Sequence, residues 1–129
     1  GMAYAQPAII DLFNKVKYPY NINLLTQEKA MDALKHRYDV NDWVKLLLQE
    51  RANTMNAVQQ LPFCKEVYPS DTNFFLARMT DATAIYNYLI NKGIVVRNRT
   101  NVQLCDNCLR ITIGSKSENT ELIAALRKY

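Results

Sequence analysis

The stretch NFFLARM, residues 73–79, decides the fold because it carries the clearest strand signal in the chain. Side chains alternate between the two faces of a strand, with Phe75, Ala77 and Met79 on one face here and Phe74 and Leu76 on the other. Apolar residues on both faces are typical of a central strand that is covered. We therefore expect a sheet whose middle runs through this stretch.

A helix and two further strands are expected after this strand. Residues 81–92 have the pattern of a helix, and Gly93 suits its carboxyl-terminal cap. Residues 94–97 and 109–113 are rich in Ile, Val and Leu, which favours strands. A loop over residues 98–107 is expected to connect these two strands.

The last helix has its own start signal. Gly114 ends the strand before it, and Ser115 with Glu118 fits a capping box, in which each side chain bonds the backbone N–H of the other residue. The inward face of this helix is predicted to consist of Leu122, Ile123, Leu126 and Tyr129.

Three helices are expected before the sheet. Pro7 suits the first position of one helix, and Thr26 and Asp39 suit the N-caps of the next two. The third helix ends by Leu61, and a short strand follows at residues 65–68. The predicted class is therefore α+β, with a small, mostly antiparallel sheet of three or four strands packed with helices and preceded by amino-terminal helices.

The composition fits one globular domain. The chain has 129 residues, 49% of them hydrophobic and 22% charged, and a net charge of +4. That mildly basic balance suits an anionic ligand without requiring nucleic acid. No apolar run approaches the length of about 20 residues that a membrane helix needs. We expect a cytoplasmic protein, because the three cysteines are an odd number and no secretion signal precedes them.

Cys105 and Cys108 have the spacing of half a zinc site. A structural zinc ion needs four ligands, and only Cys64 and His36 remain, both far away in sequence. We therefore predict no metal and interpret the pair as thiols that flank a turn at residues 106–107.

Arg110 and Arg97 are the candidate binding residues. Arg110 shares a face of its strand with Thr112, opposite Leu109, Ile111 and Ile113. Arg97 shares a face with Val95, opposite Ile94 and Val96. An arginine on a strand is usually just solvated. If the two strands pair in register, however, the two guanidinium groups converge, and two close cations favour an anion between them.

Five motifs in this chain resemble those of histidinol-phosphate aminotransferases. They are PYNIN at 19–23, VYPSDTNF at 67–74, GIVVR at 93–97, CLRITIG at 108–114 and the helix opening at 118–126. Their order and spacing agree with that family over essentially the whole chain. Thr72 stands where the family commonly has Ala, a small difference that leaves the sites in place.

The resemblance implies the carboxyl-terminal small domain of such an enzyme, over residues 1–129, with residues 1–25 as a connector from a large domain that this chain lacks. It implies that Arg110 binds the carboxylate of glutamate or the phosphate of the other substrate, and that Arg97 assists at the far end. The substrates implied are small anions, namely glutamate, 2-oxoglutarate and histidinol phosphate, in a reaction of histidine biosynthesis.

The resemblance also implies pyridoxal 5′-phosphate and a homodimer for the parent enzyme. The family's Schiff-base lysine lies in a Ser-Lys segment upstream of the part matched here, so we expect no catalytic residue in this chain. We expect the chain alone to be inactive and to bind no cofactor. The alternative is a free-standing α+β module that binds a ligand or RNA, with Phe74 or Phe75 stacking on bases.

Overall fold

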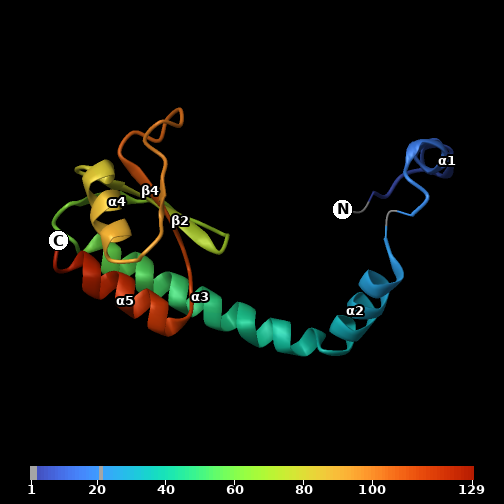
Figure 1. Cartoon of the computed structure of the whole chain (residues 1–129), viewed down its shortest axis with the longest axis horizontal. Helices are drawn as coiled ribbons and strands as arrows, with labels where there is room; N and C mark the ends of the chain where they lie inside the picture. The colour runs from blue at the N-terminus through green and yellow to red at the C-terminus, as the bar shows by residue number, and fades with distance from the viewer. Residues whose placement is uncertain (1–2, 21) are drawn as a thin grey trace. The chain divides into compact units, whose positions relative to one another are not determined.

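Nine regular elements follow one another in the computed structural model, which describes residues 3–20 and 22–129 (Figure 1). In the described part they are α1 Pro7–Val16, α2 Leu24–Lys35, α3 Arg37–Gln59, β1 Cys64–Val67, β2 Phe74–Met79, α4 Ala82–Asn91, β3 Arg97–Asn98, β4 Cys108–Thr112 and α5 Lys116–Leu126. The motif residue Asn21 lies outside the described residues. The chain forms two compact units, Gly1–Val40 and Asn41–Tyr129, and the boundary falls within α3.

The sheet confirms the predicted α+β class. Its strand order is β1-β2-β4-β3, and each neighbouring pair is antiparallel. The strand predicted at residues 94–97 is wrong in extent, because β3 covers only Arg97–Asn98. Ile94 instead closes the end of α4, since its N–H donates to the Leu89 carbonyl at 2.9 Å. Residues 94–96 therefore precede the sheet, and Val95 is 78% exposed.

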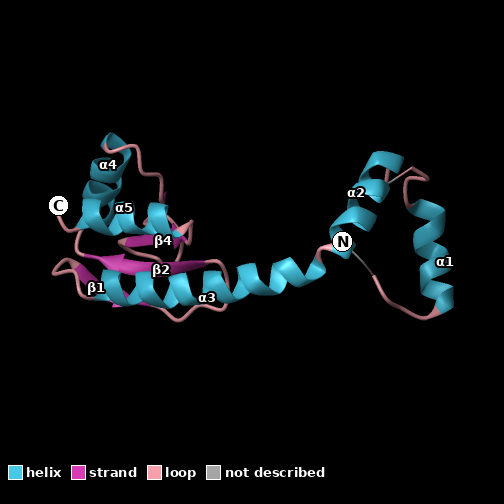
Figure 2. Ribbon diagram, turned by 90° about the horizontal axis from the view of Figure 1, so that it is seen from below, coloured by secondary structure: helices cyan, strands magenta, loops and turns pink. Residues whose placement is uncertain are grey.

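One face of the sheet packs against helices α3, α4 and α5. Phe75, Ala77 and Met79 of β2 join the core with 1% exposure or less, as do Val58 of α3 and Leu126 of α5. Figure 2 shows the strands β1, β2 and β4 with α3, α4 and α5 around them. We call this side of the sheet the helix face.

The other side, which we call the open face, differs from the prediction. The strand β2 is central as expected, but Phe74, Leu76 and Arg78 are only half-buried and alternate with the buried residues. Although β2 carries apolar side chains on both faces, the helices of this unit bury only one of them.

The start of α2 was also predicted wrongly. Thr26 is not the N-cap, because the Asn23 side chain caps the helix and accepts a hydrogen bond from the Thr26 N–H at 2.8 Å. Asn is as good a cap as Thr, so the helix begins two residues before Thr26, at Leu24. Asp39 likewise lies in the first turn of α3, which starts at Arg37.

The first unit exposes much apolar surface. Helices α1 and α2 contain no buried residue. Leu12 and Phe13 of α1 are 61% and 49% exposed, and Leu25 of α2 is 73% exposed. An amphipathic helix is stable in water when its apolar face is covered, so these two helices expose, within the described part of their unit, apolar side chains that a partner surface would bury.

The capping box of α5 is present as predicted. The Ser115 N–H donates to Glu118 Oε2 at 2.7 Å, and the Glu118 N–H donates to Ser115 Oγ at 3.4 Å. A Cβ on Gly114 would lie 2.7 Å from the same Glu118 oxygen, so glycine leaves the room that the box requires. The hydrogen bonds from the Ser115 hydroxyl and N–H lower the pKa of Glu118.

We expect the charge of Glu118 to stabilise the fold only above acidic pH. A carboxyl whose pKa is lowered by folding contributes stability above its unfolded pKa of about 4.3, and that contribution is lost as pH falls through the folded pKa. Glu118→Gln keeps the shape of the box and removes the charge. Urea midpoints of the two proteins should differ at pH 7, and the difference should shrink as the pH falls through the lowered folded pKa of Glu118. A difference that does not change with pH would contradict this expectation.

Candidate anion-binding site

Arg110 lies on the open face, held by buried neighbours. Leu109 and Ile111, on either side of it in β4, are 0% and 1% exposed on the helix face. Because alternate residues of a strand point to opposite faces, the half-buried Arg110 side chain points away from the helices. The predicted orientation of the Arg110 side chain is confirmed. Because β4 is packed on its other face, the position of the Arg110 guanidinium group is restricted.

Arg97 lies directly opposite Arg110 in the neighbouring strand β3. Residues paired in this way have Cβ atoms about 4.5–5.5 Å apart on the same face of the sheet. The sequence left this register open, and the structure brings the two arginines together. Like charges at such positions destabilise a sheet, so an anion bound between them is favourable.

Phe74 supports the Arg110 side chain. The Arg110 guanidinium carbon lies 4.8 Å from the centre of the Phe74 ring, a cation–π distance. Among the described residues, Arg110 Nε is buried without a hydrogen-bond partner. The guanidinium group thus has a ring beneath it, and its Nε is a buried donor without a partner in the described part of the chain. Because the ring carries Arg110, it is less available for the base stacking that the RNA-binding alternative requires.

Arg78 is a second arginine of the open face, which the sequence reasoning missed. Its guanidinium carbon lies 5.6 Å from the centre of the Tyr68 ring, and its Nε is likewise buried and unpaired within the described part of the chain. Arg78 pairs across the sheet with Cys108, and the hydrogen bond to that thiol is the main cause that raises the pKa of Arg78. The period-two pattern of β2 already places Arg78 on the side of Phe74 and Leu76.

The two neighbouring thiols flank a turn, as predicted. The Cys108 N–H donates to the Cys105 carbonyl at 3.0 Å. Burial raises the pKa of the Cys108 thiol, and burial also raises that of Cys64. A raised pKa opposes the thiolate form that nucleophiles and metal ligands need. Within residues 3–20 and 22–129 no group of three or more His, Cys, Asp or Glu side chains could hold a metal ion.

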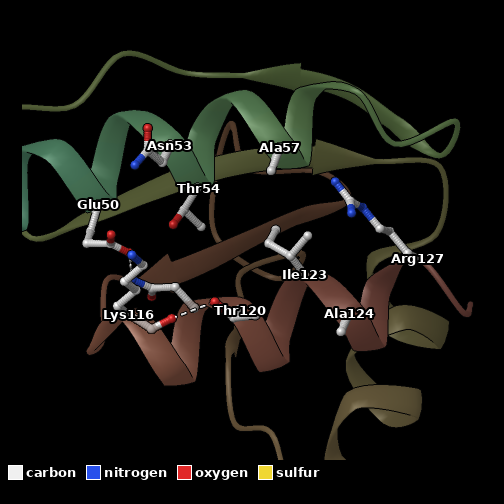
Figure 3. Close-up of a pocket in the computed structure, with 10 residues that line it drawn as sticks. Glu50, Asn53, Thr54, Ala57, Lys116, Thr120, Ile123, Ala124 and Arg127 are labelled. Carbon is white, nitrogen blue, oxygen red and sulfur yellow. Dashed lines mark hydrogen bonds between the residues drawn. The ribbon is translucent and has the colours of Figure 1, made fainter.

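A separate groove of about 280 Å³ lies between α3 and α5 (Figure 3). Glu50 faces it from α3 with 8% exposure, and Glu50 Oε2 accepts a hydrogen bond from Asn119 Nδ2 at 3.0 Å. Asn119 also bonds both the N–H and the carbonyl of Gly114. The buried carboxylate disfavours an anion, so this groove is a structural junction of α3, α5 and the end of β4.

The chain belongs to the class I and II aminotransferases, because the profile described as "Aminotransferase class I and II" matches residues 1–126. No helix in the described part of the chain is both long enough and apolar enough to cross a membrane.

Among its relatives are the histidinol-phosphate aminotransferases of Bacteroides fragilis and Bacteroides thetaiotaomicron, which are 53% and 50% identical to it over 129 residues. The chain covers only 37% of the length of either relative. A solved histidinol-phosphate aminotransferase from Clostridium acetobutylicum matches 94% of this chain with a TM-score of 0.84 and 25% identity, and again 37% of that protein is covered.

The lysines of this chain do not fit the cofactor of that family. A lysine that forms a Schiff base is desolvated, or activated by a neighbouring group, in a pocket. Here every lysine side chain is exposed: Lys15, Lys17, Lys29, Lys35, Lys45, Lys65, Lys92, Lys116 and Lys128. The family therefore implies pyridoxal phosphate for a whole enzyme.

Proposed function

We propose that the chain is the carboxyl-terminal small domain of a cytoplasmic histidinol-phosphate aminotransferase and supplies its anion-binding arginines. The observation that carries this proposal is the Arg97–Arg110 pair on the open face. Arg110 would hold the carboxylate of glutamate or 2-oxoglutarate, or the phosphate of histidinol phosphate, by two parallel hydrogen bonds. Arg97 would bind the same ligand from the neighbouring strand.

The rest of the enzyme would come from outside this chain. We propose a large domain that carries pyridoxal phosphate and its lysine, with residues 1–25 as the connector, and a homodimer as the working form. The exposed apolar side chains of α1 and α2, and Trp43 of α3 at 65% exposure, support this because they need a covering surface. The function of this chain would be to bind and orient substrate, while the cofactor supplies the electron sink of transamination.

A direct test uses the full-length protein that contains this chain. With pyridoxal phosphate, it should transfer the amino group of glutamate to imidazole-acetol phosphate. A protein that catalyses transamination with other substrates but does not accept imidazole-acetol phosphate would contradict the substrate proposed. Absence of any transamination would contradict the proposal as a whole.

We expect the isolated chain to form no specific adduct with pyridoxal phosphate. Because its lysines are exposed and equivalent to ordinary surface amines, borohydride reduction should label several of them weakly. Peptide mapping of the reduced protein measures this. A single lysine labelled in a one-to-one ratio would show that the chain has its own cofactor site.

A further inference from the structure

The turn between β1 and β2 binds the carbonyl oxygen of Phe74 with two side-chain hydroxyls. Ser70 Oγ donates to this oxygen, and Thr72 Oγ1 donates to it at 3.0 Å. The two hydroxyl oxygens lie 3.0 Å apart, and the Phe74 N–H also points to Thr72 Oγ1 at 3.4 Å. Phe74 is therefore fixed through both of its backbone polar groups on the side of the turn.

These hydroxyls replace a missing strand contact. The hydrogen bond from the Tyr68 N–H to the Leu76 carbonyl, at 2.9 Å, lies just beyond the last paired residue of β1. An antiparallel ladder would next join residue 70 to Phe74, but β1 ends at Val67. A backbone carbonyl at the end of a sheet needs another donor, and the hydroxyls of Ser70 and Thr72 supply it.

The turn is also tied to the long helix α3. Arg51 Nη1 donates to the Thr72 carbonyl at 2.6 Å, across 21 residues of sequence. On its other side, Phe74 pairs with Thr112 of β4. The position of Phe74 is thus set directly by the turn hydroxyls and by β4, and indirectly by α3, which holds the turn at Thr72.

We propose that Thr72 and Phe74 are positioning residues that aim the Arg110 guanidinium at the anionic substrate. The inference rests on the proposed function of Arg110. The Phe74 ring lies 4.8 Å from the guanidinium carbon, so a shift of the first residue of β2 moves the surface on which Arg110 lies. The hydroxyl of Thr72 holds that residue in place. The alanine that is common at this position in the family that the motifs resemble has no such hydroxyl.

The test compares four variants of the full-length enzyme, with Arg110→Lys as the reference for the proposed function. Thr72→Val and Phe74→Leu should raise the KM for glutamate about three- to tenfold with a smaller change in kcat, as the strength of a cation–π contact implies. Thr72→Ser keeps the hydroxyl and should have the same KM as the unmodified enzyme. Thr120→Val is the matched control, because Thr120 Oγ1 bonds a backbone carbonyl on α5, at 2.7 Å, and does not touch the open face.

The outcomes separate this inference from the proposed function. If Arg110→Lys raises the KM but Thr72→Val and Phe74→Leu leave it unchanged, the positioning inference is overturned and the proposed function stands. If Arg110→Lys leaves the KM unchanged, both are overturned. If the KM of Thr72→Ser is raised as much as that of Thr72→Val, the role of the hydroxyl is also overturned. Should Phe74→Leu not fold, the pair Thr72→Val and Thr72→Ser decides the question.

Discussion

Arg110→Ala should lower kcat/KM for glutamate in the full-length aminotransferase by about a hundred- to ten-thousandfold, since hydrogen bonds to charged groups contribute about 1.5–3 kcal/mol each and two would be lost. Arg110→Lys keeps the charge but not the planar fork. We expect the kcat/KM of Arg110→Lys to lie between those of Arg110→Ala and the unmodified enzyme, about tenfold below the latter. Steady-state kinetics with glutamate varied at saturating acceptor measures both.

Arg127→Ala is the control for this experiment. Arg127 is exposed at the end of α5 and lines the groove between α3 and α5, away from the open face. Its replacement should leave kcat/KM unchanged. Equal losses in Arg110→Ala and Arg127→Ala would mean that general charge, and not a fixed arginine on β4, attracts the substrate.

Phe75→Ala should destabilise the second unit by about 3–5 kcal/mol, the usual cost of emptying the space of a core phenylalanine. Phe75 is 1% exposed and is among the largest fully buried side chains of the described residues. Domains of this size are stable by only about 5–15 kcal/mol, so much of the stability would be lost. Urea unfolding of the chain, followed by far-ultraviolet circular dichroism, measures the change.

Phe74→Ala is the matched control because it is the same substitution one residue earlier. Phe74 is half-buried on the open face, so its replacement should cost only about 1–2 kcal/mol. The two variants should therefore differ clearly in their urea midpoints. Similar losses in both would contradict the assignment of the two side chains to different faces of β2.

The faces of the strands could be predicted from the sequence because they follow from local geometry. In β2 and β4 successive side chains point to opposite faces, which separates Phe75 from Phe74 and directs Arg110 away from Leu109 and Ile111. Which face of β2 the helices cover could not be predicted in this way, because both faces carry apolar side chains. The capping box of Ser115 and Glu118 is local in the same way. The start of α2 was missed because Asn23 and Thr26 are both good caps, and propensity does not choose between them.

The contacts between distant residues could not be predicted in this way. The pairing of Arg97 with Arg110 depends on the register of β3 and β4, which nine residues of loop (99–107) separate. The bond from Arg51 to the Thr72 carbonyl joins α3 to a turn, and no periodicity indicates it. Thr72 looked unremarkable in the sequence because the contribution of its hydroxyl depends on where β1 ends.

The most direct test of the central claim is a crystal structure of the full-length enzyme with glutamate bound. The account predicts that the Arg110 guanidinium holds the carboxylate by two hydrogen bonds of about 2.7–2.9 Å while remaining stacked on Phe74, with Arg97 on the same side of the ligand. A structure in which glutamate binds elsewhere and Arg110 contacts only solvent or protein would contradict it.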